Sequence, residues 1–157
     1  MTQVTRPTPR RLDAFTLPSE PGNERLALAR VADSVAGLDL AQARLERLKT
    51  AVAEATMNAI EHGNQNRAEI PVEVEVTQVG DEIVVAITDQ GGEAHPGPDN
   101  PEEPDLLMKL DGGQSPRGWG LFLIRNMVDA MDVTINGQRH TISLTMRTGG
   151  AADGEHV

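Results

Sequence analysis

The stretch "IPVEVEVTQVGDEIVVAITDQGG", residues 70–92, decides the fold class because it contains the two clearest strand patterns in the chain. Valine recurs at every second position from 72 to 76, between glutamates, which predicts a strand with one buried face and one solvated face. Gly80-Asp81 forms a turn into residues 83–88, which are almost wholly apolar and are expected at the centre of a sheet. The stretch therefore predicts two consecutive strands joined by a tight turn.

A strand and a helix are expected upstream of this pair. "LDAFTL", residues 12–17, alternates weakly between apolar and polar residues and predicts an edge strand. Residues 23–36 have the spacing of a helix, which directs Leu26, Val31 and Val35 inward.

A second, longer helix is expected to begin at Asp39, a good N-cap residue, and to run to His62, with Gly63 at the stop position. Apolar residues recur along it at intervals of three and four and form one stripe: Leu45, Leu48, Val52, Ala55 and Ala59.

The chain after the strand pair begins with a long segment rich in Gly and Pro. A loop of more than about twenty residues inside a compact domain is unusual and is typical of a lid or binding loop. A third helix is expected over residues 120–131, followed by a hairpin of residues 132–137 and 140–147. This order of elements predicts a two-layer α/β sandwich, with a mixed, mainly antiparallel sheet and helices on one face.

Length and composition indicate one domain over residues 12–147, between a flexible N-terminal arm (1–11) and a flexible C-terminal tail (148–157). The net charge of −10 argues against binding a nucleic-acid backbone or an anionic membrane, but it leaves room for a bound nucleotide. The chain has no cysteine, which excludes disulfides, thiolate chemistry and Cys-based zinc sites. It has no long apolar run and no signal-peptide pattern, so we expect a cytoplasmic protein.

Three polar residues on the second helix raise the question of function. Glu54, Asn58 and Glu61 follow one another at spacings of four and three, away from the apolar stripe. Asn is disfavoured inside a helix because its amide competes for backbone partners. By itself the pattern favours an ordinary solvated face, and the alternative is that these groups are directed at a ligand.

Two further segments are candidates for the rest of a site. In "ITDQGG", Asp89 follows the most apolar strand and is suited to accept a hydrogen bond from an exocyclic amine, while Gly91 and Gly92 let the backbone approach a flat ring. In "RGWGLFLI", residues 117–124, a Gly-x-Gly opens an apolar helix whose unpaired amides are suited to bind phosphate. Taken singly, each pattern favours the ordinary explanation, an acidic turn residue before glycines for the first and a glycine-containing helix start for the second.

Together, the three segments resemble the GHKL ATPase superfamily, the Bergerat fold of gyrase B, heat-shock chaperone ATPases and histidine-kinase catalytic domains. The N box of that superfamily corresponds to "EATMNAIEHG", the G1 box to "DQGG" and the G2 box to "RGWGLFLI". Within it, the chain is most similar to the anti-sigma factor serine/threonine-protein kinases, which share the E-x-x-x-N-A-x-x-H-G pattern and the "GLFLI" helix. The resemblance covers about residues 12–147.

This resemblance implies a protein kinase that uses ATP and Mg²⁺. Asn58 would coordinate the Mg²⁺ that bridges the ATP phosphates, and Glu54 would be the general base for the attacking hydroxyl. Asp89 would bind the adenine amino group, and residues 93–116 would form the ATP lid. The other nucleotide-binding residues implied are His62, Gly91, Arg117, Gly118, Trp119, Gly120, Leu121 and Thr141.

The residues of the G2 box would contribute in different ways. Gly118 and Gly120 would donate backbone amides to the phosphates, and Arg117 would meet the terminal phosphate. Trp119 and Leu121 would line the site through their main chain.

The sequence departs from the family pattern at two places. Glu93 stands where the G1 box usually has a second Gly, and His140-Thr141 stands where the last strand usually has Gly-Thr, so the adenine-side contact of Thr141 loses its usual context. His62 is interpreted as a packing or capping group and not as a phosphoacceptor. The remaining histidines lack metal-ligand spacing and are expected at the surface: His95, His140 and His156.

The function that the resemblance implies is an anti-sigma factor and serine/threonine kinase, which sequesters a sigma factor and phosphorylates an anti-anti-sigma (STAS-domain) protein. It also implies a homodimer. The first helix, with Arg25 and Arg30, is a candidate partner surface, and a solvated basic face is the alternative. Two other functions stay open: a non-catalytic, nucleotide-responsive binding module, and a detached histidine-kinase catalytic domain. Glu54 favours the kinase, because a pure binding module needs no base.

Overall fold

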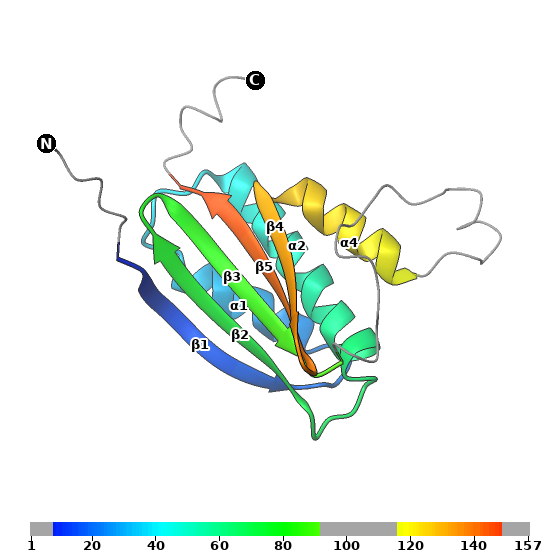
Figure 1. The fold of residues 1–157 in the computed structure, drawn as a ribbon. Helices are drawn as coiled ribbons and strands as arrows, with labels where there is room; N and C mark the ends of the chain where they lie inside the picture. The colour runs from blue at the N-terminus through cyan, green and yellow to red at the C-terminus, as the bar shows by residue number, and fades with distance from the viewer. Residues whose placement is uncertain (1–7, 92–115, 149–157) are drawn as a thin grey trace, which may run out of the picture.

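The computed structural model describes residues 8–91 and 116–148 (Figure 1). In chain order the described elements are β1 (Arg10–Pro18), α1 (Glu24–Ser34), α2 (Gln42–Asn58), a π-helical turn η1 (Ala59–Gly63), β2 (Pro71–Val79), β3 (Glu82–Asp89), α4 (Pro116–Met127), β4 (Ala130–Asn136) and β5 (Arg139–Arg147). Almost all of the expected lid, and most of the expected arm and tail, lie outside the described residues. None of the described helices is long and apolar enough to cross a membrane.

The five described strands form one sheet in the order β1-β2-β3-β5-β4, so β1 is at an edge and β3 is central, as predicted. Every described strand pair is antiparallel, whereas a mixed sheet was expected. The reason is the position of β5. The connection from β3 through α4 makes β4 run in the same direction as β3, but β5 lies between the two strands and separates them.

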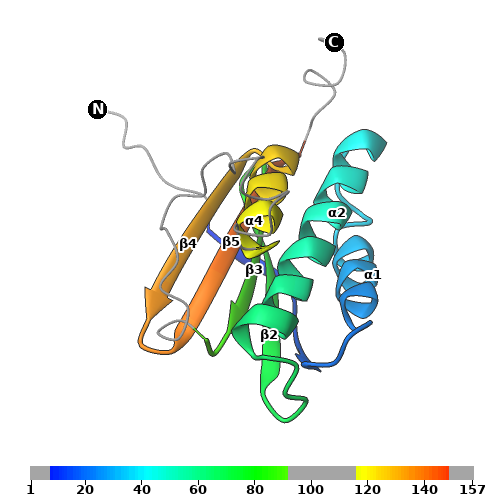
Figure 2. The same cartoon turned by 90° about the vertical axis from the view of Figure 1, so that its right-hand side faces the viewer.

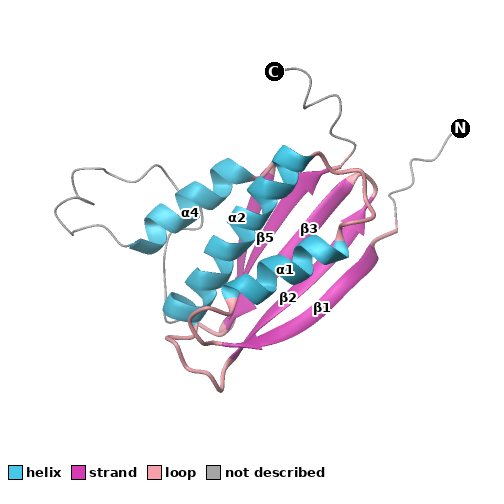
Figure 3. Cartoon of the chain, turned by 180° about the vertical axis from the view of Figure 1, so that it is seen from behind, coloured by secondary structure: helices cyan, strands magenta, loops and turns pink. Residues whose placement is uncertain are grey.

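The sheet and the helices form two layers, which confirms the predicted α/β sandwich. Helices α1, α2 and α4 cover one face of the sheet and leave the other uncovered (Figure 2), and Figure 3 views the molecule from the helical side. Aliphatic side chains at alternate positions of β2, β3 and β5 form the sheet side of the core: Val72, Val74, Val76, Ile83, Val85, Ile87, Ile142, Leu144 and Met146. Alternate residues of a strand point to the same face of the sheet, so these buried side chains together form one apolar layer.

Two expectations for the first half of the chain are wrong. Leu26 was expected inward but is 54% exposed, because α1 turns Ala27 and Val31, four residues apart, toward the core. The second helix does not begin at Asp39. Its N-cap is Ala41, and α2 begins at Gln42 without a side-chain cap.

Both later helices also end differently from the prediction. Helix α2 does not stop at Gly63 as an α-helix but widens at Ala59 into η1, where the Asn64 N–H donates to the Ala59 carbonyl at 2.8 Å. Helix α4 ends at Met127, and residues 130–131, which were expected in the helix, begin β4. Pairing with β5 across the ladder outweighs the helical pattern there.

Candidate functional site

The end of α2, the end of β3 and the start of β5 meet at one end of the molecule (Figure 1). Asn58 is the last residue of α2, and Asp89 is the last residue of β3. The turn η1 packs directly against β3, so two of the three segments singled out in the sequence, the N box and the G1 box, come together.

Gly63 is a point of close approach between these two segments. A Cβ atom on Gly63 would lie 2.2 Å from Cγ of Asp89, well inside van der Waals contact. Glycine is therefore required here by the packing of the Asp89 carboxylate, in addition to the position at the helix end that the sequence suggested. A π-helical turn of this kind is frequent at functional sites.

The Asp89 carboxylate is buried, with 1% of the residue exposed, and donors hold both of its oxygens. The Gly91 N–H donates to Oδ1 at 2.8 Å, and Nδ1 of His140 lies 3.2 Å from Oδ2. His140 was expected at the surface, but it is 4% exposed. His140 is buried because it pairs with Asp89 in the β3–β5 ladder, which places both side chains on the helical face of the sheet.

Asn64 is a positioning residue that the sequence analysis missed. It is 1% exposed, and its Oδ1 accepts a hydrogen bond from the Gln90 N–H at 2.8 Å, next to Asp89. Its Nδ2 donates to Ser19 Oγ at 2.9 Å and to the Pro71 carbonyl at 3.2 Å. Asn64 thus joins the end of η1 to three other segments. The available signal was an Asn directly after the helix-ending glycine.

Asn58 is not on a solvated face. The residue is 7% exposed, and its Nδ2 has no hydrogen-bond partner among residues 8–91 and 116–148. Glu54, one turn earlier, is half-buried, whereas Glu61 is exposed. Because an unpaired buried amide is costly, its presence makes Asn58 a candidate to bind a group outside the described residues.

Asn58 suits a Mg²⁺ ion that takes one oxygen ligand from the protein and the others from a bound nucleotide and water. In the described part of the chain, no cluster of three or more acidic, His or Cys side chains could hold a metal by itself. Mg²⁺ bound with a nucleotide needs only one or two protein oxygens besides phosphates and waters. The Asn58 amide oxygen is a suitable oxygen ligand of this kind.

The Gly-x-Gly segment lies within the start of α4 and not before it, because the helix begins at Pro116. Pro116 has no N–H, so the unpaired amides of the first turn belong to Arg117 and Gly118, whereas the N–H of Gly120 lies within the helical hydrogen-bond pattern. Helix α4 lies beside α2, and its first turn is directed toward the end of the molecule where α2 ends (Figures 1 and 3). Leu121 is buried in the core, so its side chain packs inside the protein.

The structure does not bring the Thr141 side chain to Asp89. Its hydroxyl lies 2.8 Å from the hydroxyl of Thr88, and Thr88 lines a hollow on the uncovered face of the sheet. Neighbouring residues of a strand point to opposite faces, so Thr141 points away from His140. His62 lies in η1 and is half-buried.

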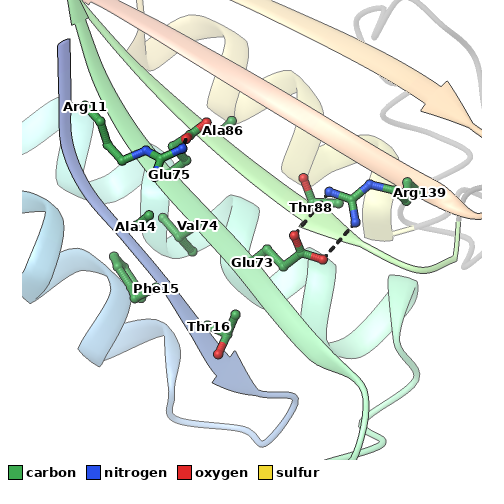
Figure 4. Close-up of a pocket in the computed structure, with 10 residues that line it drawn as sticks. All are labelled: Arg11, Ala14, Phe15, Thr16, Glu73, Val74, Glu75, Ala86, Thr88 and Arg139. Carbon is green, nitrogen blue, oxygen red and sulfur yellow. Dashed lines mark hydrogen bonds and ion pairs between the residues drawn. The ribbon is translucent and has the colours of Figure 1, made fainter.

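The hollow on the uncovered face has a volume of about 390 Å³ (Figure 4). Its charged groups bind one another: Arg139 donates to both oxygens of Glu73, at 2.9 and 3.1 Å, and Arg11 lies 2.8 Å from Glu75. None of the residues predicted for the site lines it. Because its charges are already compensated, we place the candidate site on the helical face, at Asn58 and Asp89.

The first-helix arginines also differ from one another. Arg30 donates to both oxygens of Asp13, at 3.2 and 2.8 Å, and its guanidinium carbon lies 4.2 Å from the centroid of the Phe15 ring. These contacts fasten α1 to β1. Arg25 and its neighbour Leu26 are exposed.

The fold is that of an α/β ATPase domain, and residues 17–146 match the family described as the histidine kinase-like ATPase domain. The chain belongs to this family, which confirms the GHKL resemblance. It is similar to the anti-sigma F factor of Clostridium beijerinckii, with 36% identity over 118 residues, covering 73% of this chain and 78% of that protein. It is also similar to the serine-protein kinase RsbW of Oceanobacillus iheyensis, with 33% identity over 132 residues, covering 78% and 77% of the two chains.

A solved structure supports the fold. The RsbU and RsbW domains of a Mycobacterium tuberculosis protein superimpose with a TM-score of 0.60 at 20% identity, covering 90% of this chain and 32% of that one. The chain thus has the fold of the family and lies among its anti-sigma and serine-kinase members in sequence.

Proposed function

We propose that this protein is an ATP- and Mg²⁺-dependent anti-sigma factor and serine/threonine kinase, which sequesters a sigma factor and phosphorylates an anti-anti-sigma (STAS-domain) protein. The observation that carries the proposal is the contact between Gly63 and Asp89, which joins the N-box helix to the end of the G1-box strand. The names of the similar proteins, anti-sigma F factor and serine-protein kinase, support the class of partner and of reaction.

Asp89 would recognise the base of the nucleotide. Its carboxylate is a buried acceptor at the end of β3, and adenine carries an exocyclic amine that donates hydrogen bonds. Gly91 lies beside it, where the lack of a side chain permits close approach of the ring. His62 would pack near this part of the site, and the contact proposed for Thr141 would involve its main chain.

Asn58 would bind the metal through its amide oxygen, and its unpaired Nδ2 would find a partner in the loaded site. Mg²⁺, when bound with ATP, would neutralise charge on the phosphates. At the start of α4, the amide of Gly118 would bind the phosphates, and Gly120, which has no side chain, would let them approach the helix closely. Arg117 would meet the terminal phosphate, and Trp119 and Leu121 would contribute their main chain.

Glu54 would be the catalytic base. It would accept the proton of the substrate hydroxyl as the hydroxyl oxygen bonds to the γ-phosphorus and ADP leaves. Glu54 is half-buried one helical turn before Asn58, so its carboxylate could face the ATP phosphates and still be reached by the hydroxyl of a substrate protein.

The partner contacts are proposed from the relatives and from α1. We propose a homodimer that acts in the cytoplasm and binds proteins and not nucleic acid or membrane, in keeping with the net charge of −10. The exposed pair Arg25 and Leu26 is the candidate contact on α1, since Arg30 is held by Asp13 and Phe15.

Replacing Glu54 by Gln tests the kinase assignment. Labelled ATP is incubated with the protein and a STAS-domain partner, and phosphate transfer and ATP binding are measured separately. Glu54→Gln should lower transfer by about 10²–10⁴-fold and leave ATP binding nearly unchanged, because only the base is lost. Glu61→Gln is the matched control, since Glu61 is exposed in the same helical segment.

The alternatives give different results in this experiment. Transfer at the parent rate by Glu54→Gln would show that Glu54 is not the base. ATP binding and sigma-factor binding without any transfer by the parent would indicate the non-catalytic binding module. Transfer to a response-regulator aspartate through a histidine would indicate the histidine-kinase class.

A further inference from the structure

The pair formed by His140 and Asp89 joins the proposed base-binding carboxylate at the end of β3 to the start of β5. The side chains are 5% and 2% exposed, and their nearest atoms, Nδ1 and Oδ2, are 3.2 Å apart. The two residues are directly opposite each other in the β3–β5 ladder. The histidine is therefore built into the wall of the proposed base-binding site.

The chemistry of the pair assigns its donor. A carboxylate only accepts hydrogen bonds, so the contact with Oδ2 is a hydrogen bond in the tautomer of His140 that carries its proton on Nδ1. The Gly91 N–H donates to the other oxygen, Oδ1, at 2.8 Å. A donor on each oxygen prevents rotation of the carboxylate about its Cβ–Cγ bond, and Gly63 packs against its Cγ.

We propose that His140 is a positioning residue for base recognition, which holds the Asp89 carboxylate in the orientation that accepts a hydrogen bond from adenine and rejects guanine. The inference rests on the proposed binding of ATP at this site. It deepens that proposal, because it assigns base selectivity to a residue that would not touch the reacting phosphates.

The chemical basis is the difference between the two bases. Adenine carries an amine at the position where guanine carries a carbonyl oxygen. A fixed carboxylate oxygen attracts the amine and repels the carbonyl, and a site built around one hydrogen bond discriminates strongly against a ligand that lacks it. A carboxylate that is free to rotate loses part of both effects. Loss of the His140 donor should therefore weaken ATP binding and also narrow the preference for ATP over GTP.

Two substitutions of His140 distinguish the effect of its hydrogen-bond donor from the effect of its ring volume. Asn carries Nδ2 on Cγ, as His carries Nδ1, so His140→Asn keeps a donor near Asp89, while His140→Leu keeps bulk and removes the donor. Binding of Mg·ATP and Mg·GTP is measured by calorimetry for the parent and both variants. We expect His140→Leu to bind ATP about tenfold to a hundredfold more weakly with a reduced ATP:GTP preference, and His140→Asn to restore most of both.

Leu144→Val is the control for loss of stability. Leu144 is buried on the same face of β5, four residues from His140, and it pairs with Val85. This variant should melt earlier and keep the parent ATP:GTP preference. A parent-like preference in His140→Leu, or an equal loss in His140→Asn and His140→Leu, would overturn the proposal.

A measurement on the parent protein covers the case in which His140→Leu does not fold. ¹⁵N NMR of the imidazole should show a protonated Nδ1 that shifts when Mg·ATP is added. A resonance of Nδ1 without its proton would overturn the proposal. A parent protein that binds neither nucleotide would instead contradict the proposed function, and this inference with it.

Discussion

Asn58 and Gly63, five residues apart at the end of one helical segment, meet different physical requirements. Asn58 is buried with an amide nitrogen that has no partner in the described part of the chain, which lowers the stability of the free protein. Gly63 has no side chain because the Asp89 carboxylate occupies the space that a Cβ would need. Asn58 is a proposed metal ligand with an unpaired amide nitrogen, and Gly63 makes room for the Asp89 carboxylate, the proposed base-binding group.

Gly63→Ala should displace Asp89. The added methyl group would lie 2.2 Å from Cγ of Asp89, so either η1 or the end of β3 must shift. We expect a loss of roughly 1–3 kcal/mol in the free energy of unfolding, and weaker ATP binding. Urea denaturation and nucleotide titration measure the two effects.

Gly37→Ala is the matched control for this substitution. A Cβ on Gly37 meets nothing within 4 Å, so the change should be neutral or slightly stabilising. If Gly63→Ala behaved like Gly37→Ala in both measurements, the packing of Asp89 against Gly63 would be without consequence.

At the scale of the elements, one ion pair connects the start of α2 to the corner between α4 and β4. Arg44, which is 9% exposed, donates to Asp129 Oδ2 at 2.9 Å, and the Arg147 N–H donates to the same oxygen at 2.8 Å. Burial raises the pKa of Asp129, but the Arg147 N–H and the Arg44 guanidinium outweigh it and hold the pKa below its usual value. These interactions of the Asp129 carboxylate therefore hold α2, β5 and the connection between α4 and β4 together, at the corner opposite the candidate site.

The stability supplied by Asp129 should depend on pH. A lowered folded-state pKa means that this contribution is fully present above the unfolded value of about 3.9 and is lost as the pH falls through the lowered pKa. Asp129→Asn should lower the free energy of unfolding by roughly 1–3 kcal/mol at pH 7, a value reduced for the partial exposure of the pair. The difference from the parent should shrink below about pH 4.

Urea denaturation at pH 7 and at pH 3 measures this dependence. Asp132→Asn is the control, because Asp132 is exposed on the neighbouring strand β4 and should change stability little at either pH. A gap between Asp129→Asn and the parent that stayed constant across this range would contradict the role of the charge.

For the whole molecule, the residues of the candidate site lie together at one end of the two-layer fold (Figure 1). The helices cover one face of the sheet, and the residues proposed to bind ATP lie where α2 and β3 end and where α4 and β5 begin. A ligand that binds only the folded protein raises its stability by mass action. Nucleotide binding should therefore be visible as a change in the melting temperature of the full chain.

Mg·ATP at a hundred times its dissociation constant should raise the melting temperature of the parent by about 5–10 °C, equivalent to about 2.7 kcal/mol. Asn58→Ala should show no such increase. In the absence of nucleotide, however, Asn58→Ala should melt no earlier than the parent, because the substitution removes an unpaired buried amide from a helix. Differential scanning fluorimetry measures both. An Asn58→Ala protein that is stabilised by Mg·ATP as much as the parent would refute the metal-binding role.

Local patterns were sufficient for most of the fold. The alternation of valines in β2, the apolar run of β3 and the three- and four-residue spacings of α2 each follow from the geometry of a single element. The N-box, G1-box and G2-box motifs are likewise contiguous, so the family could be recognised from the sequence. The boundaries were less accurate, because capping at Ala41 and the end of α4 at Met127 depend on packing with other elements.

The sequence by itself determined the order and type of the elements and the identity of the three motifs, because these depend on residues close together in the chain. Only the tertiary structure decided that His140 is buried against Asp89, 51 residues away, that Asn64 holds Gln90, and that Gly63 packs on the Asp89 carboxylate. Each of these contacts depends on strand register and on how the helices lie over the sheet. A buried polar group is paired across the fold, and no local propensity specifies which distant residue will reach it.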